Sequence, residues 1–334
     1  MKEVGKRIVW PERGKVAIED FEVRQPEPKE VLIKTVITLI SSGTEMAFLM
    51  SLPNTPNKFP QYPGYSNAGK VIAVGKKVND IRVDDRVVSM GPHASHVLIS
   101  ENQVQLIPSD LSFDEATFST LSSVALQGIR KARIELGDSV LILGQGLVGQ
   151  LALQLAKLSG ALPLIAVDLY DSRLHISSRN GADYRLNPEK VDLEEEVKRI
   201  TGGKGTNVVI DTTGNPEVIP LSFELTSRAG RVILLGSPRG ESKVNFYSQV
   251  HRKGISVIGA HNFVRPKYES FHGWWTQRDD NELILKLLNK SMLKVRDLVS
   301  LKVNFQKAPE VYKKILESRK EILGPLLQWD IEMA

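Results

Sequence analysis

The chain has 334 residues, 41% hydrophobic and 25% charged, which is enough for two globular domains of ordinary size. Its net charge of +5 is spread over short mixed stretches, and this pattern argues against a nucleic-acid-binding surface. Cysteine is absent, which excludes disulfides, thiolate nucleophiles and cysteine-ligated metal sites. The N-terminus has no apolar signal core, and no stretch approaches the ~20 apolar residues of a membrane helix. We therefore expect a cytoplasmic protein with no membrane or nucleic-acid partner.

The first third of the chain predicts strands, because short runs rich in valine and isoleucine alternate with glycine, proline and aspartate turns. These runs lie at residues 15–23, 30–40, 69–75 and 85–90. From about residue 120 to 260, apolar runs alternate with helical stretches, which predicts βαβ units and a parallel sheet. Residues 280–320 have helical periodicity, and the sequence QKAPEV has a proline where a helix would begin.

A dinucleotide fingerprint lies in the stretch SVLILGQGLVGQLALQLAKLSGA. Gly144, Gly146 and Gly149 have the G-x-G-x-x-G spacing, directly after an apolar strand. In this motif the first glycine permits the tight turn, the second lets the backbone approach a pyrophosphate, and the third allows close helix packing. The helix then begins at Leu147 and Val148, and its N-terminus faces the phosphates.

An acid follows the next apolar run. LPLIAVD ends in Asp168, about 20 residues after the last glycine, where a carboxylate can accept from both adenosine ribose hydroxyls. Because the same carboxylate would repel a 2′-phosphate, the sequence favours NAD over NADP. Arg173 is placed to hold the ribose or the adenine edge. The alternative is a glycine-rich turn that only packs, but the strand, the helix and the acid together argue against it.

Taken with these motifs, the stretches ISSGTE, PGYSNAGKVIAVG, DTTGNPEV and LLGSPRG make the chain resemble the medium-chain dehydrogenase/reductase superfamily from end to end. The arrangement resembles the alcohol and sorbitol dehydrogenases. The motifs SGTE and PGYSN are similar to those of the zinc-free, bacteriochlorophyllide dehydrogenase-like proteins. The resemblance implies an α/β fold. A GroES-like, mostly β catalytic domain would span 1–121, a doubly wound Rossmann domain 122–257, and a return to the catalytic domain 258–334. It also implies an active site between the domains and a homodimer or homotetramer.

The resemblance implies further residues along the cofactor. Those expected on the adenosine side are Thr212, Thr213 and Gly214, and those expected at the nicotinamide are Gly236, Ser237, Ala260 and His261.

The departures from zinc-containing members concern the metal ligands. Where those members have the first cysteine, this chain has Ser41 or Ser42, and the sequence does not decide between them. Tyr65 stands in place of the ligand histidine and Ser66 in place of the glutamate that follows it. The third ligand region, 119–123, offers serines, and the four-cysteine structural zinc lobe is missing. Hydroxyls are poor zinc ligands, so we expect no metal.

Without zinc, hydrogen-bond donors and a titrating group must stabilise an alkoxide and move its proton. Tyr65 could donate through its phenol, or only form a wall of the pocket. Thr44 matches the family's relay threonine, or closes a turn. Glu45 matches the acid that follows it, or holds the start of a helix. His93 lies where the family lines the substrate pocket, or is structural, and His261 is a second candidate base.

Three functions fit these observations. The first is a zinc-independent, NAD-dependent oxidoreductase that acts on a hydroxyl or carbonyl group of a polyol, sugar or cyclitol. The second is an NAD(P)H-dependent enone or quinone reductase, although Asp168 argues against the NADPH that such enzymes generally use. The third is a nonenzymatic, nucleotide-binding redox sensor, since a fold does not fix a function.

Overall fold

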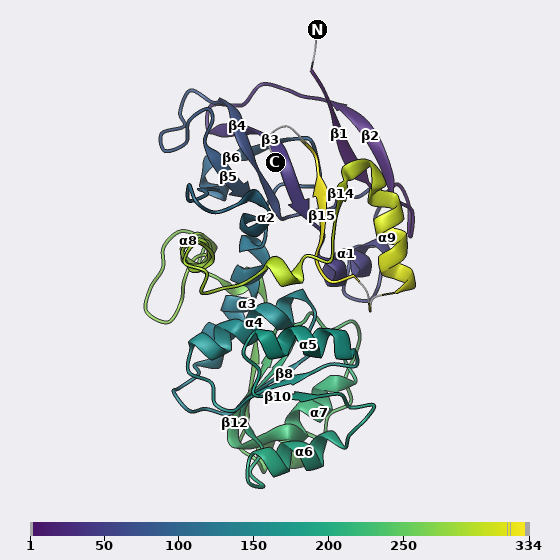
Figure 1. Cartoon of the computed structure of the whole chain (residues 1–334), viewed down its shortest axis with the longest axis vertical. Helices are drawn as coiled ribbons and strands as arrows, with labels where there is room; N and C mark the ends of the chain where they lie inside the picture. Colours follow the sequence, from purple (N-terminus) through teal and green to yellow (C-terminus); the bar gives the residue numbers. More distant parts are fainter. Residues whose placement is uncertain (1–2, 319, 321, 331–334) are drawn as a thin grey trace. The chain divides into compact units, whose positions relative to one another are not determined.

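The structure is a computed structural model, and it describes residues 3–318, 320 and 322–330. The chain forms two compact units (Figure 1). The first unit joins Met1–Leu121 to Asn281–Ala334, and the second is Ser122–Asp280. The two ends of the sequence therefore fold together, and the middle forms a unit of its own.

The first unit is mostly β. Its main sheet has seven strands in the order β14-β15-β3-β4-β5-β7, with β6 paired to β3, and β1 and β2 form a separate antiparallel pair. Strand β3 is antiparallel to β4, β6 and β15. The strands are β1 (Val4–Val9), β2 (Ala17–Glu22), β3 (Glu30–Leu39), β4 (Asn67–Val74), β5 (Arg86–Ser89), β6 (His96–Ser100), β7 (Val104–Leu106), β14 (Leu301–Asn304) and β15 (Pro325–Gln328).

Helices α1 (Ser42–Leu49) and α9 (Ala308–Glu317) pack together in the first unit. Both contribute to one buried core, α1 through Met46 and Leu49 and α9 through Tyr312 and Ile315. Helix α9 has a proline in its first turn, as the sequence QKAPEV predicted. Because α1 follows directly from β3, this packing brings side chains of α9 to the end of a central strand. The unit also contains α2 (Phe113–Ala116) and the first residues of α3 (Ser119–Ala132).

The second unit is a doubly wound parallel sheet, in the order β10-β9-β8-β11-β12-β13. Helices α4 and α5 lie on one side of this sheet and α6 and α7 on the other (Figure 1). The strands are β8 (Val140–Leu143), β9 (Leu164–Val167), β10 (Tyr184–Leu186), β11 (Thr206–Asp211), β12 (Thr226–Leu234) and β13 (Ser256–Gly259). The helices are α4 (Leu147–Leu158), α5 (Asp171–Arg179), α6 (Leu193–Ile200), α7 (Val218–Leu225) and α8 (Gln277–Asn289), of which α8 crosses into the first unit. The predicted fold class is confirmed.

Residues 258–280 group with the parallel sheet, whereas the sequence prediction gave them to the catalytic domain. Their side chains explain the difference. Arg265 donates to the hydroxyl of Ser123 at 2.8 Å, and Asp280 accepts from Arg130 Nε at 2.7 Å. Since these buried polar contacts lie within the second unit, they hold the segment there. The return to the first unit begins at Asn281.

The helices are short, and α3 has 14 residues. In the part of the chain that the structure describes, no helix combines the length and the apolar character needed to cross a bilayer.

Candidate active site

The predicted phosphate-binding turn joins β8 to α4. Gly144 has a φ of +86°, in the left-handed region that favours glycine. A Cβ at Gly149 would lie 2.0 Å from the carbonyl oxygen of Gly144, so only glycine lets α4 pack on the turn. A Cβ at Gly146, the N-cap of α4, would have no described heavy atom beyond its chain neighbours within 4 Å. The space before Leu147 and Val148 is therefore open, and the turn fits a pyrophosphate.

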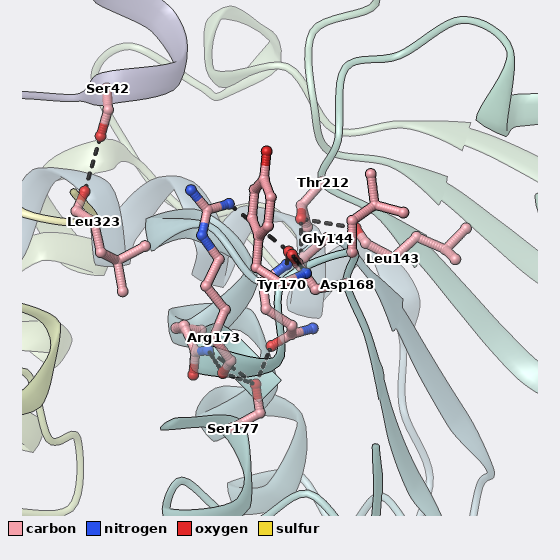
Figure 2. Close-up of polar contacts among 12 residues, drawn as sticks. Ser42, Leu143, Gly144, Asp168, Tyr170, Arg173, Ser177, Thr212 and Leu323 are labelled. Carbon is pink, nitrogen blue, oxygen red and sulfur yellow. Dashed lines mark hydrogen bonds and ion pairs between the residues drawn. The ribbon is translucent and has the colours of Figure 1, made fainter. Parts of the chain in front are cut away.

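Asp168 and Arg173 come together beside this turn (Figure 2). The carboxylate of Asp168 accepts the backbone N–H of Gln145 at 2.7 Å and that of Tyr170 at 2.8 Å. The guanidinium of Arg173 lies 3.8 Å from Asp168 Oδ2 and 4.9 Å from the centre of the Tyr170 ring. The acid, the arginine and the aromatic ring thus form one small surface, which can meet a ribose and an adenine.

Two threonines after β11 hold the neighbouring turn in place. The hydroxyl of Thr212 contacts the carbonyl oxygens of Leu143 and Gly144, each at 2.9 Å (Figure 2). Thr213 donates its N–H and its hydroxyl to the carboxylate of Asp211, at 2.9 and 2.6 Å. Burial raises the pKa of Asp211, and the two bonds from Thr213 oppose this shift. These contacts tie the end of β11 to the phosphate-binding turn.

The remaining predicted cofactor residues follow β11, β12 and β13. Gly214 and Gly236 approach so closely that a Cβ on Gly236 would lie 2.6 Å from the nitrogen of Gly214. Ser237 contacts the same turn, since a Cβ on Gly214 would lie 2.8 Å from its carbonyl oxygen. Ala260 is buried just after β13. His261 is exposed, and its Nδ1 accepts a backbone N–H two residues further on.

In the first unit, the end of β3 keeps the tight turn into α1 that the sequence ISSGTE predicted. Ser41 is the N-cap residue of α1, and its backbone N–H donates to Glu45 Oε1 at 2.7 Å. The hydroxyl of Ser42 donates to the carbonyl oxygen of Leu323 at 2.8 Å (Figure 2). Thr44 is half-buried. Both serines therefore serve the turn itself, and Glu45 does hold the helix start.

Glu45 also belongs to a closed group of polar side chains, which we call the elbow cluster: Thr38, Glu45, His93, Tyr312 and Trp329. The hydroxyl of Tyr312 donates to Glu45 Oε2, which lies 3.1 Å from His93 Nε2. His93 Nδ1 lies 2.8 Å from the hydroxyl of Thr38, which accepts Trp329 Nε1–H at 3.0 Å. Each of the five residues is at most 9% exposed. The cluster joins β3, α1, α9, the segment before β6 and the residue after β15 through buried side chains.

The hydrogen-bond partners fix the direction of two donations, from Trp329 to Thr38 and from Tyr312 to Glu45. Where Thr38 gives its own proton to His93 Nδ1, His93 Nε2–H donates to Glu45. Burial, and then the charge of Glu45, raises the pKa of Tyr312 well above its ordinary value, so its phenol stays a donor at neutral pH.

The sequence of this chain is similar to those of known dehydrogenases. A family model described as zinc-binding dehydrogenase matches residues 148–275. L-threonine 3-dehydrogenase of Pyrococcus furiosus is 30% identical over 281 residues, covering 75% of this chain and 80% of the relative. The chain belongs to the medium-chain dehydrogenase/reductase superfamily. D-guloside 3-dehydrogenase of Escherichia coli strain K12 is 29% identical over 258 residues, covering 76% of this chain and 73% of that relative. The resemblance seen in the sequence is confirmed at the level of the superfamily.

Solved structures of superfamily members share the fold. A candidate zinc-binding dehydrogenase from Sinorhizobium meliloti, bound to NADP, has a TM-score of 0.84 at 20% identity and covers 98% of this chain and 100% of that one. An alcohol dehydrogenase from Escherichia coli, complexed with NADH, has a TM-score of 0.85 at 19% identity and covers 97% of this chain and 99% of that one. Both likenesses show the fold alone.

The metal site of zinc-containing superfamily members has no matching donor set here. Within the described residues, no three of the His, Asp and Glu side chains come together in a way that could hold a metal ion. In the regions of the second and third ligands, the buried hydroxyls of Ser66, Ser119 and Ser122 find no hydrogen-bond partner in the described part of the chain. Because hydroxyls bind zinc poorly, these residues do not fit that metal.

Three members of the elbow cluster, Thr38, Tyr312 and Trp329, could not be predicted from the sequence. Tyr312 lies in the apolar stripe of α9 with Ala308, Val311 and Ile315, where it is indistinguishable from a core residue. Thr38 and Trp329 lie in and beside strands. The one usable signal was a polar-tipped side chain within an apolar stripe, which must find a hydrogen-bond partner when buried.

The structure gives the predicted catalytic residues different surroundings. Tyr65 and Thr44 are half-buried, whereas Glu45 and His93 are closed off, with both ring nitrogens of His93 engaged by protein groups. A proton that reaches His93 must therefore pass through Glu45 or Thr38. A direct role of His93 on the substrate stays a prediction.

Proposed function

We propose that this protein is a zinc-independent oxidoreductase, which transfers a hydride between NAD(H) and a hydroxyl or carbonyl group of a polyol, sugar or cyclitol-like substrate. The observation that carries the proposal is that the chain combines a complete dinucleotide turn with hydroxyl side chains at the family's metal-ligand positions, where the described residues form no metal-ligand set. Relatives named as guloside and threonine dehydrogenases support oxidation of a secondary alcohol. Related structures with NADH or NADP support a nicotinamide cofactor.

In this proposal the two units supply different parts of the reaction. The fingerprint glycines, Asp168 and Arg173 hold the dinucleotide, whose nicotinamide, when bound, accepts or gives the hydride. Tyr65 donates from its phenol to the oxygen on which negative charge develops, and the hydroxyl of Thr44 relays the proton of the substrate hydroxyl to solvent, or back from solvent in the reverse direction. The elbow cluster supports both residues, because Glu45 fixes the start of α1 and His93 packs against Gly64, the residue before Tyr65.

The direct test is turnover on a panel of substrates. Polyols such as sorbitol, inositols and glycosides should reduce NAD, whereas enones and quinones should not oxidise NADH or NADPH. Turnover of enones with NADPH would favour the reductase. Tight NADH binding without turnover of any of these compounds would favour a nucleotide sensor.

Asp168→Ser should raise the affinity for NADPH relative to NADH by about tenfold or more, because like charges facing each other are strongly unfavourable and this change removes one of them. The measurement is a titration of each dinucleotide against wild type and variant. An unchanged ratio of the two dissociation constants would show that Asp168 does not contact the adenosine ribose.

The purified protein should contain far less than one zinc per chain, and treatment with a chelator should leave its turnover intact. The physical reason is that this chain has hydroxyl side chains, Ser41 or Ser42, Tyr65 and the serines of 119–123, at the positions where zinc-containing members have their ligands. Elemental analysis beside an activity assay checks both statements. Stoichiometric zinc that leaves together with activity contradicts the metal-free proposal.

A further inference from the structure

A buried polar group joins the two helices that carry the cofactor residues. We call it the α4–α5 cluster: the side chains of Gln145, Gln150, Ser177 and Asn180. The first three are 0% exposed. Amide and hydroxyl groups cost free energy when buried unless they are hydrogen-bonded, so their contacts must be specific. Apolar side chains could fill the same space without this requirement. The polar side chains of the cluster therefore add directional hydrogen bonds, which apolar packing does not supply.

Gln150 is the centre of the α4–α5 cluster. Its Nε2 group donates to the carbonyl oxygen of Arg173 at 2.9 Å and to the hydroxyl of Ser177 at 2.8 Å. Its Oε1 accepts from Asn180 Nδ2 at 3.0 Å. Three hydrogen bonds from one residue of α4 thus fix α5 at the position of the cofactor arginine.

The other end of the cluster reaches the cofactor acid. The hydroxyl of Ser177 donates to Gln145 Oε1 at 2.9 Å, and Gln145 Nε2 donates to the carbonyl oxygen of Ile142 at 3.1 Å. The backbone N–H of the same Gln145 donates to Asp168 Oδ2 at 2.7 Å. A continuous chain of hydrogen bonds therefore runs from the carboxylate of Asp168 to the backbone of Arg173 (Figure 2).

We propose that Gln150 and Ser177 are positioning residues for cofactor choice. They hold the backbone of Arg173 so that its guanidinium stays beside Asp168 and on the ring of Tyr170, with only 16% of the Arg173 side chain exposed. In that arrangement the carboxylate of Asp168 determines whether the ribose can carry a 2′-phosphate, while the guanidinium of Arg173 is engaged by Asp168 and the ring of Tyr170. This inference rests on the proposed function, in which Asp168 meets the adenosine ribose.

Release of α5 has a defined electrostatic consequence. A guanidinium that leaves a carboxylate 3.8 Å away becomes available to another anion, and Arg binds phosphate oxygens well. The 2′-phosphate of NADPH presents such oxygens at the ribose, where an arginine accommodates it in related folds. Loosening the α4–α5 cluster should therefore weaken the preference for NADH without any change to Asp168 or Arg173.

The test uses Gln150→Leu and Ser177→Ala, with NADH and NADPH binding measured by fluorescence titration. Each change should lower the preference for NADH by ~3- to 30-fold, within the range that residues outside a site exert on it. Most of the change should come from tighter NADPH binding. Ser159→Ala is the matched control for Ser177→Ala, because it removes a hydroxyl that donates to the carbonyl oxygen of Leu155 at 2.9 Å, at the end of α4 and outside the α4–α5 cluster. It should leave the ratio unchanged.

A double variant distinguishes the positioning role of Gln150 from a merely structural one. In Gln150→Leu combined with Arg173→Ala, the gain in NADPH affinity should vanish, because the released guanidinium is gone. An unchanged ratio in Ser177→Ala, or a gain that persists without Arg173, would overturn the inference. If these results occur while Asp168→Ser still shifts the ratio, the proposed function stands and only the positioning role fails.

Discussion

Tyr65→Phe should lower turnover by ~10²–10⁴-fold, the range expected when a donor to a developing charge or a proton-transfer group is removed. The substitution removes one hydroxyl and keeps the ring, so the wall of the pocket survives. NADH binding should hardly change, because the fingerprint glycines and Asp168 belong to the other unit of the chain. Steady-state kinetics on a polyol, beside an NADH titration, measure both quantities.

Tyr62→Phe is the matched control for this prediction. Tyr62 is an exposed tyrosine of the same unit, and its hydroxyl accepts from Arg7 at 3.2 Å. Its loss should leave turnover within about threefold of wild type, as expected for a surface substitution. Near-normal turnover in Tyr65→Phe, together with a collapse in His261→Ala, would move the acid–base role to the nicotinamide side.

The turn between β8 and α4 could be predicted residue by residue because its signals are local, and its role in binding a nucleotide stays a prediction. Gly144, Gly146 and Gly149 lie within six residues, and the backbone requires glycine at Gly144 and Gly149, whereas Gly146 leaves open space. Asp168 and Arg173 follow at the end of the next strand and in the next helix, so short sequence distances decide their positions. The α4–α5 cluster was missed, because buried glutamines on an apolar helix give no pattern of their own.

The elbow was predictable only in part, for the opposite reason. The end of β3, the turn and the acid Glu45 could be predicted from six consecutive residues. The sequence did not decide whether Glu45 acts as the family's acid or holds the start of a helix. Tyr312 stands 267 positions further along the chain, and no periodicity connects it with Glu45. Only the folding of the C-terminal segment onto the first unit brings the two together. For the same reason the boundary near residue 258 was misplaced, because the contacts of Arg265 with Ser123 are also long-range.

Glu45→Ala should lower the free energy of unfolding by ~3–5 kcal/mol, because each buried donor that loses its acceptor costs ~1–3 kcal/mol. The change leaves three donors without an acceptor: the N–H of Ser41, the hydroxyl of Tyr312 and the Nε2–H of His93. For a unit of this size, Tm should fall by about 10 °C, since each kcal/mol corresponds to roughly 2–4 °C. Urea unfolding, followed by the fluorescence of tryptophans in the first unit, measures the free energy.

Two further variants show whether this loss comes from the closed elbow cluster. Glu45→Gln keeps an acceptor for Tyr312 and His93 but turns an amide NH2 toward the N–H of Ser41, so it should cost less than Glu45→Ala and at least the ~1–3 kcal/mol of one unsatisfied buried donor. Glu310→Ala removes an exposed glutamate of the same unit and should change stability by less than ~0.5 kcal/mol. A loss below about 1 kcal/mol in Glu45→Ala would mean that water reaches these donors, because solvated groups lose little when a partner is removed. Tyr312 and His93 would then lie in an open pocket, where His93 could meet a substrate directly.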